Sequence, residues 1–187
     1  MQEKVTVARA DVEAVDDLRP LFVALHQHHR SVADLPLVAD DEAWRARRAT
    51  YLAWFAEGRA LLFVASAHET PVGYALVVWH EGADDTFPLA PRYAEVYTLS
   101  VAEEARGAGV GGRLLDAVDE ALAGEGDPPL AIAVMAGNDD ALRFYARRGL
   151  VPGELLLYRF RAARVDPASA YPRRPEAACG NRPNNRS

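Results

Sequence analysis

Cysteine and long apolar runs are scarce in this sequence of 187 residues, and their absence excludes several classes of protein. The single cysteine, Cys179, has no second thiol for an intramolecular disulfide and cannot build a cysteine-based zinc site. No apolar run reaches the roughly 20 residues that span a bilayer. The first residues lack the basic and apolar regions of a signal peptide. We therefore expect a cytoplasmic protein with no membrane partner.

The sequence also has fewer basic than acidic residues. Lys and Arg number 21 against 27 Asp and Glu, which gives a formal net charge of −6. Binding to a phosphate backbone requires a basic surface, so we expect no nucleic-acid partner. Half of the residues are apolar, which is enough to bury a core in one domain.

The end of the sequence lacks the side chains that build a core. Residues 166–187 contain no Val, Ile, Leu, Met, Phe or Trp, but they hold four prolines and four arginines. Such a segment cannot bury enough apolar surface to offset its ordering entropy. We therefore predict one domain over residues 1–165 and a disordered tail over residues 166–187. The alternative is a segment that docks on a neighbouring subunit of a homodimer.

Apolar spacing before the tail predicts an alternation of strands and helices. Two helices are expected to begin at Asp11 and at Asp40-Asp41, and a third carries apolar residues from Val110 to Leu122. A fourth, short helix is predicted over residues 139–148. Strands are predicted over residues 5–8, 60–67, 72–80, 94–101, 130–134 and 154–161, the second and third forming a hairpin. This order indicates a mixed sheet covered by helices, in the α/β or α+β class.

A glycine-rich turn joins the strand at residues 94–101 to the helix that begins near Val110. It has four glycines within six positions, in the run Arg106-Gly107-Ala108-Gly109-Val110-Gly111-Gly112. Glycines allow the backbone to approach a ligand closely. The helix adds unpaired N–H groups and the positive end of its dipole, which favour a phosphate or pyrophosphate.

Two common phosphate-binding motifs fit this turn poorly. A Walker P-loop requires Lys and then Ser or Thr after the last glycine, whereas Gly112 is followed by Arg113. A dinucleotide motif G-x-G-x-x-G matches Gly107, Gly109 and Gly112, and the acidic pair that begins at Asp139 lies roughly where a ribose-binding acid would be expected. That motif, however, normally begins its fold, and here only one strand–helix–strand unit follows. The dinucleotide interpretation is the weaker alternative.

Two segments together resemble a third family. Residues 106–111 resemble the Q/R-x-x-G-x-G/A signature of the GCN5-related N-acetyltransferases, the GNAT superfamily. Residues 138–150 resemble its second signature, an Asn, then an Ala, then an aromatic-Tyr pair, closed by Gly149 and an apolar residue. Leu150 stands where Phe is commoner in the family. The two signatures occur in the family's order, and the element order is similar over about residues 4–162.

The resemblance implies a fold and an activity. The fold would be a mixed, mostly antiparallel central sheet flanked by helices. The activity would be transfer of an acetyl group from acetyl-CoA to a primary amine of a small molecule or peptide, by direct attack in a ternary complex without a metal. The alternative is a non-catalytic module of the same fold that binds or senses acyl-CoA.

The resemblance also implies a set of residues that bind CoA. Backbone N–H groups of the turn would hold the pyrophosphate, in the segment Arg106, Gly107, Ala108, Gly109, Val110, Gly111 and Gly112. The main chain of Leu99, Ser100 and Val101 would pair with the pantetheine arm as this strand splays from its neighbour. An N–H near Leu99 would polarise the thioester carbonyl. Asn138 would hold the cofactor arm.

Acyl transfer to an amine requires a proton donor and a proton acceptor. Tyr145 matches the family's usual donor to the departing thiolate and would also contact the cofactor; packing between helix and sheet is its structural alternative. Glu95 is the leading base candidate, since strand alternation predicts Glu95, Tyr97 and Leu99 on one face. An exposed strand glutamate is the plain alternative for Glu95, and His80 is a second candidate base.

The histidines at positions 26, 28 and 29 form the remaining cluster. On a helix only His26 and His29 share a face. No carboxylate in the neighbouring sequence completes a metal site, and such a site requires three or more ligands. The resemblance places this region beside the acceptor pocket. We therefore expect a substrate contact and no metal.

Overall fold

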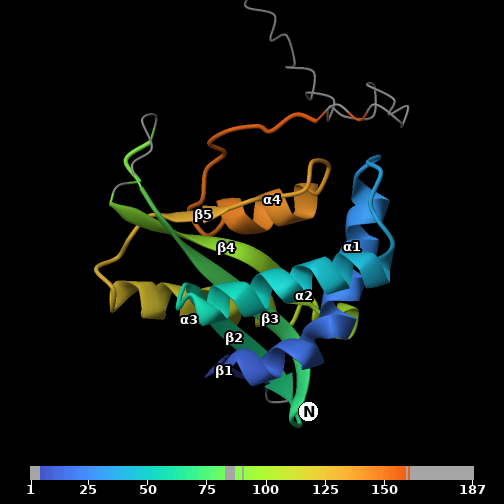
Figure 1. Ribbon diagram of the computed structural model, residues 1–187, viewed down its shortest axis with the longest axis horizontal. Helices are drawn as coiled ribbons and strands as arrows, with labels where there is room; N and C mark the ends of the chain where they lie inside the picture. The colour runs from blue at the N-terminus through green and yellow to red at the C-terminus, as the bar shows by residue number, and fades with distance from the viewer. Residues whose placement is uncertain (1–4, 83–86, 90, 159, 161–187) are drawn as a thin grey trace, which may run out of the picture.

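Five strands form one sheet that lies between two layers of helices (Figure 1). The computed structural model describes residues 5–82, 87–89, 91–158 and 160. In spatial order, the strands are β1 (Thr6–Ala10), β2 (Ala60–Ala67), β3 (Thr70–Glu81), β4 (Arg92–Val101) and β5 (Leu130–Ile132). All neighbours are antiparallel except β4 and β5, which are parallel. The prediction of a mixed, mostly antiparallel sheet is confirmed.

Each face of the sheet is covered by its own helices. The 3₁₀ helix η1 (Val12–Leu18), α1 (Arg19–Val32) and α2 (Asp40–Ala56) pack on one face. Helix α3 (Val110–Ala123) packs on the other face, and α4 (Asp139–Ala146) contributes two aromatic rings to the same cluster. A short 3₁₀ turn, η2 (Glu103–Ala105), follows β4. No described helix is long and apolar enough to cross a membrane.

The first two helices begin differently from the prediction. Asp11 precedes a 3₁₀ helix, and its side chain caps nothing; the α-helix starts only at Arg19, where Pro20 suits the first turn. The N-cap of α2 is Ala39, so Asp40 lies inside the first turn. The Asp40 carboxylate is bound instead by Gln27 and His26 of α1, both at 2.9 Å. Cross-helix contacts therefore replace the predicted cap.

The predicted hairpin between β2 and β3 is confirmed. His68 and Glu69 have φ values of 47° and 67° and occupy its two-residue turn. Positive φ at both central positions is the type I′ geometry, which matches the twist of the flanking strands.

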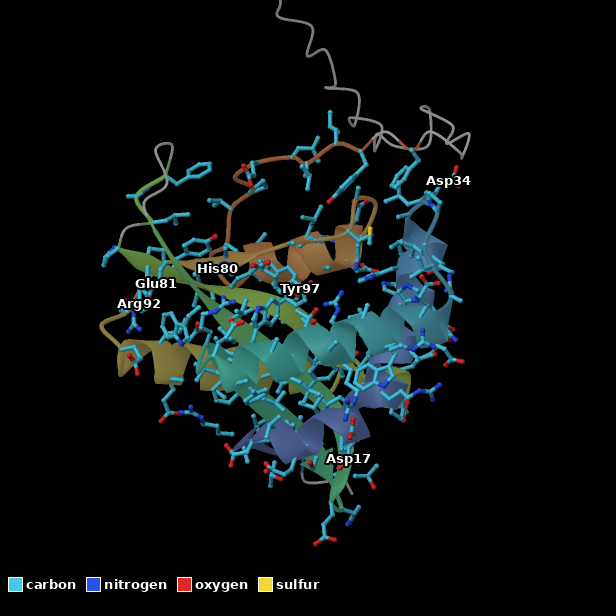
Figure 2. All side chains as sticks on the ribbon, in the orientation of Figure 1. Asp17, Asp34, His80, Glu81, Arg92 and Tyr97 are labelled. Carbon is cyan, nitrogen blue, oxygen red and sulfur yellow. The ribbon has the colours of Figure 1, made fainter. Side chains whose placement is uncertain are left out.

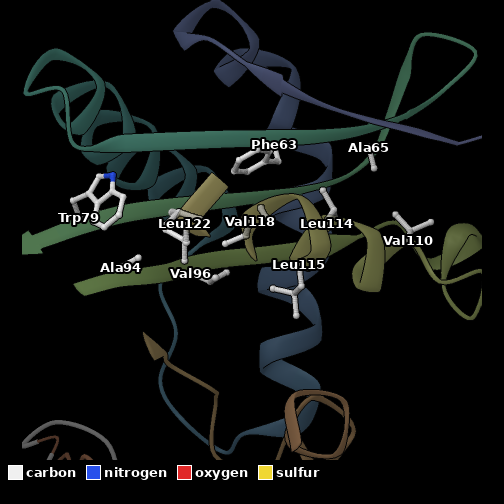
Figure 3. Packing of buried hydrophobic residues seen from close by; sticks show 12 residues of the cluster. Phe63, Ala65, Trp79, Ala94, Val96, Val110, Leu114, Leu115, Val118 and Leu122 are labelled. Atoms are coloured by element: carbon white, nitrogen blue, oxygen red, sulfur yellow. The ribbon is translucent and has the colours of Figure 1, made fainter. Parts of the chain in front are cut away.

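A continuous apolar stripe attaches α3 to the sheet (Figure 3). Leu114, Val118 and Leu122 recur every four residues and are at most 2% exposed. They meet side chains of β2, β3 and β4, including Phe63 and Val96. Burial of one such leucine contributes about 1.5–3 kcal/mol. This packing fixes the position of α3 on the sheet.

The core under α1 and α2 contains hydroxyl groups as well as apolar side chains. The Tyr51 hydroxyl donates to Oγ1 of Thr98 at 2.6 Å and lies 3.3 Å from the hydroxyl of Tyr74. Burial raises the pKa of both tyrosines above the ordinary value. Both therefore stay neutral at physiological pH, and their hydrogen bonds join α2 to β3 and β4.

The predicted strand at residues 154–161 is wrong for the part of the segment that the structure describes. Residues 154–158 and 160 belong to no strand, and Leu155, Leu156 and Leu157 are 67–70% exposed. Three leucines in a row lack the alternation that gives a strand one buried face. β5 is also shorter than predicted and ends at Ile132. The predicted tail, with Cys179, lies outside the described residues.

We predict that Leu114→Ala lowers the free energy of unfolding by about 2–5 kcal/mol, because it leaves a cavity under α3. Chemical denaturation followed by circular dichroism measures the loss. Leu142→Ala on α4 is the matched control, since Leu142 is 43% exposed and should lose less than about 1 kcal/mol. Equal losses in the two variants would contradict this account of the core.

Candidate active site

The turn between β4 and α3 presents a row of backbone N–H groups. Gly107 and Gly109 have φ values of 75° and 76°, in the left-handed region that disfavours other residues. Gly109 is the N-cap of α3, and the first N–H bonded back into the helix is that of Arg113, to the Gly109 carbonyl at 3.1 Å. Within the described part of the chain, no N–H from Gly107 to Gly112 has a protein acceptor. Six consecutive donors at a helix N-terminus form a site for an anion.

The other two glycines of the turn lie against α4. A Cβ on Gly111 would stand 3.4 Å from the ring of Phe144, so α4 packs closely on the first turn of α3. Nη2 of Arg148 donates to the Gly112 carbonyl at 3.3 Å, and the same guanidinium is paired with Asp116. These contacts hold the turn against α4.

The sheet excludes the dinucleotide alternative. A dinucleotide fold is built on a mostly parallel sheet, whereas only β4 and β5 are parallel here. Asp139 and Asp140 lie in the first turn of α4, where Asp140 is paired with Arg143 at 2.5 Å. Both acids follow β5 along the chain, but they lie inside α4 and not at the end of the strand, where a ribose-binding acid is found.

Strand β4 loses its partner β5 midway along its length. The pairing covers only three positions and ends where Val96 faces Ile132. Beyond Val96, and among the described residues, β4 has no strand on that side through Val101. The main chain there is available to a ligand that lies along the strand. Figure 2 shows Tyr97, the first residue after the separation, between α2 and α4.

An extra residue in β4 overturns the prediction that Glu95, Tyr97 and Leu99 share a face. Leu76 of β3 pairs with Thr98 and the next residue pairs with Val96, so Tyr97 has no partner in the register. Such a bulge reverses the alternation of side chains. Val96 and Leu99 both pack on the α3 side, and Glu95 therefore points to the opposite face, toward α1 and α2.

The three strand residues expected to bind the cofactor have their side chains turned into the protein. Leu99 and Val101 pack against the α3 cluster, while Ser100 is 4% exposed and its hydroxyl donates to the Leu21 carbonyl at 2.9 Å. Arg106 also turns back, with Nε donating to the Val101 carbonyl at 3.2 Å. These residues thus offer a ligand their main chain, while their side chains stabilise the strand.

Helix α4 carries the second predicted motif. Oδ1 of Asn138 accepts from the Ala141 N–H at 3.1 Å, so the side chain caps the helix and keeps its amide NH₂ group for another contact. Tyr145 packs beside Phe144, with ring centroids 5.1 Å apart, at the edge of the α3 cluster. Burial raises the pKa of Tyr145 well above its ordinary value. The phenol is therefore protonated at every pH at which the protein would work.

The two base candidates are in contact. Nε2 of His80 lies 2.8 Å from Oε2 of Glu95, and the imidazole stacks on Tyr93 with centroids 4.9 Å apart. Both side chains are partly exposed, at 31% and 20%. A carboxylate that orients an imidazole is a common arrangement for moving a proton. Sequence spacing gave each residue separately and did not indicate that they form a pair.

One of the α1 histidines, His26, has a carboxylate beside it that the sequence did not indicate. Nδ1 of His26 bonds to Asp40 at 2.9 Å, and Arg30 pairs with the same carboxylate at 2.7 Å. Gln27 and His26 together lower the pKa of Asp40 to about 2. No cluster of three metal-ligating side chains occurs within the described residues. Residues 30–37, which follow these histidines, line an open hollow of about 600 Å³.

Sequence reasoning missed one group of residues on the α1–α2 side of the site. Trp54 meets the ring of Tyr97 edge-on, with centroids 4.6 Å apart, and the guanidinium of Arg47 lies 4.5 Å from the same ring. Nη1 of Arg47 donates to Thr98 at 2.9 Å. These residues come from α2 and β4, and Arg47 and Thr98 are 51 positions apart in the sequence. No local pattern links them, because only the fold brings the two elements together.

Comparison with known proteins agrees with this geometry. One curated relative, a mycothiol acetyltransferase from Corynebacterium aurimucosum, is 34% identical over 110 residues. These residues are 56% of this chain and 34% of that protein, so the match spans about a third of the relative's length.

Two solved structures show the same fold. A GCN5-related N-acetyltransferase from Ralstonia eutropha superposes with a TM-score of 0.70 at 14% identity, over 84% of this chain and 99% of that one. An aminoglycoside N-acetyltransferase in complex with CoA superposes with a TM-score of 0.66 at 17% identity, over 86% and 97%.

The family itself is shown by a direct match. The model of the acetyltransferase (GNAT) family matches residues 22–150. This range includes the glycine-rich turn at residues 106–112 and the second motif at residues 138–150. That range is more than half of the sequence. The chain therefore belongs to the acetyltransferase (GNAT) family, as the two sequence motifs predicted.

Proposed function

We propose that this protein is an N-acetyltransferase that moves an acetyl group from acetyl-CoA to a primary amine by direct attack in a ternary complex. The observation that carries the proposal is the row of six free N–H groups from Gly107 to Gly112, next to a strand that has lost its partner. The acceptor is a small-molecule or peptide amine. The name of the CoA-bound structural neighbour, an aminoglycoside N-acetyltransferase, supports an amine acceptor.

The chain offers donors that suit each part of CoA. The free N–H groups of the turn and the dipole of α3 would hold the pyrophosphate. The unpaired edge of Leu99, Ser100 and Val101 would bond the amides of the pantetheine arm, and the free amide of Asn138 would hold the arm from the α4 side. Bound acetyl-CoA supplies the activated acetyl group as a thioester.

Two groups of this chain would move protons. Tyr145 remains protonated because it is buried, so its O–H group is present to form a hydrogen bond with the departing sulfur, and it would act as the proton donor to that sulfur. Glu95 and His80 lie on the face that α1 and α2 cover, where they would take the proton of the incoming ammonium, directly or through water. Cys179, the one cysteine, lies outside the described residues and plays no part in the proposal.

We expect CoA to raise the melting temperature by about 5–10 °C at a concentration 100 times its Kd, since it binds only the folded state. Gly109→Val should abolish this shift, because it adds a β-branched side chain among the donors. Thermal denaturation with and without CoA measures both results.

Gly58→Val is the matched control for this experiment. Gly58 also has a left-handed φ, 68°, and open space around its Cβ position, but it lies between α2 and β2. Gly58→Val introduces a similar backbone strain, about 1–2 kcal/mol, and should keep the CoA-dependent rise in melting temperature. A CoA shift that survives in Gly109→Val, or stabilisation by NAD without stabilisation by CoA, would overturn the assignment of the turn.

Tyr145→Phe should lower turnover by about 100-fold, the low end for a positioned general acid, and leave the CoA-dependent rise in melting temperature unchanged. Release of the CoA thiol over a panel of amines measures turnover. Tyr158→Phe is the control, because Tyr158 is 66% exposed and should keep wild-type activity. Full activity in Tyr145→Phe would remove the phenol as proton donor.

Glu95→Gln should slow the reaction most at low pH, where the amine is protonated, and rising pH should partly restore the rate as free amine becomes available. The rate measured from pH 6 to pH 10 tests this, with His80→Gln as a second variant of the same pair. Glu120→Gln, an exposed glutamate of α3, should follow wild type. If Glu95→Gln runs parallel to wild type at every pH, the carboxylate is not part of the base.

A further inference from the structure

Arg47 of α2 is held by aromatic rings at the point where β4 leaves β5. Its guanidinium carbon lies 4.5 Å from the centroid of Tyr97, 5.2 Å from that of Phe22 and 6.0 Å from that of Tyr51. Its Nη1 donates to Oγ1 of Thr98 at 2.9 Å, and the guanidinium also forms a hydrogen bond with the hydroxyl of Tyr51. The side chain is half-buried, and its head group faces residues of β4.

No carboxylate among the described residues neutralises this charge. The next residue, Arg48, is paired with Asp16, and Arg30 is paired with Asp40, but Arg47 enters no ion pair. A guanidinium has five N–H donors, and Thr98 and Tyr51 occupy only part of them in Arg47. Cation–π contacts stabilise the charge but leave its in-plane N–H groups free. A partly buried cation with unused donors is suited to an anion that arrives from outside.

The groups around Arg47 do not supply that anion. Glu95 lies on the same face, but its carboxylate is bound to His80, while the carboxylate of Asp40 is bound to Gln27, His26 and Arg30. His29 adds no positive charge at pH 7. Burial, followed by the charges of His28, Arg47 and His26, lowers the pKa of His29 to about 4.

We propose that the acceptor amine carries an anionic oxygen group, a carboxylate or a phosphate, and that the free N–H groups of Arg47 bind it. The proposal rests on the proposed function, which puts the thioester beside the unpaired part of β4, next to Tyr97 and Thr98. The fork of a guanidinium matches the two oxygens of a carboxylate or phosphate. Arg47 would thus set the identity and the orientation of the acceptor.

Matched pairs of amines test this proposal. The acids are glycine, β-alanine and 4-aminobutanoate, each compared with its own amide, and O-phosphoethanolamine is compared with ethanolamine. Thiol release gives kcat/KM for each amine, corrected for the fraction present as free base. We expect the anionic member of at least one pair to exceed its neutral partner by roughly 10- to 100-fold, the range that charge-assisted hydrogen bonds supply. The pair whose anionic member reacts faster shows whether the enzyme recognises a carboxylate or a phosphate.

Substitutions at Arg47 decide whether this residue causes the preference. Arg47→Gln should bring the anionic-to-neutral ratio of kcat/KM close to one, and Arg47→Lys should keep part of it, because lysine keeps the charge and loses the fork. Arg45→Gln is the matched control on the same helix, since Arg45 is exposed and should keep the wild-type ratio. The ratio does not depend on the fraction of folded enzyme, so it also holds for a destabilised variant.

Three outcomes overturn the proposal. If neutral amines react as well as the anionic ones in every pair, the acceptor has no anionic group that the enzyme recognises, while the proposed acetyltransferase function stands. If Arg47→Gln leaves the ratio unchanged, the arginine only packs α2 against the sheet. If no amine of either kind releases the thiol although CoA still raises the melting temperature, the proposed function fails and this inference fails with it.

Discussion

Between Val96 and Thr98, strand β4 changes the face to which its side chains point, and at the same place it loses its partner β5. The change of face follows from the one extra residue, Tyr97, and the pairing with β5 ends at the residue before it, Val96. The bulge turns Thr98 toward Tyr51 of α2, and it turns Leu99 toward α3. A regular strand would have kept Glu95 and Leu99 on one face. The rest of the site depends on this irregularity.

Packing on both sides keeps the strand in this shape. On one face the Tyr51 hydroxyl and Arg47 bind Thr98, and on the other face the α3 stripe covers Val96 and Leu99. Helix α4 then packs its Phe144 ring on Gly111, so it lies beside the free N–H groups of the turn without closing onto β4. A gap in the ladder costs hydrogen bonds. The two buried layers stabilise a strand that has given up those bonds.

Most of the elements and the glycine-rich turn could be predicted from the sequence, because these depend on local patterns. The glycines at 107 and 109 are required by their own backbone angles, and the apolar stripe of α3 has helical period. The bulge at Tyr97 was not predictable, since Glu95-Val96-Tyr97-Thr98 alternates like a regular strand. The pairs His80–Glu95 and Arg47–Thr98 join residues that only the fold brings together. Residues 154–158 show a different kind of error. Their apolar content predicts a strand, but the segment lacks the alternation of a strand and forms none.

The sheet itself separates the two groups that would move protons in the proposed reaction. Tyr145 belongs to the α3 side of the sheet, whereas Glu95, His80 and Arg47 belong to the α1–α2 side. In the proposed reaction, an amine that enters from the α1–α2 side would meet its base there, while the sulfur would depart toward the phenol on the other side. Beyond Val96, β4 has no partner on the β5 side among the described residues, so its edge there borders both faces of the sheet. The proposed acid and the proposed base would thus approach the reacting atoms from opposite faces of the sheet.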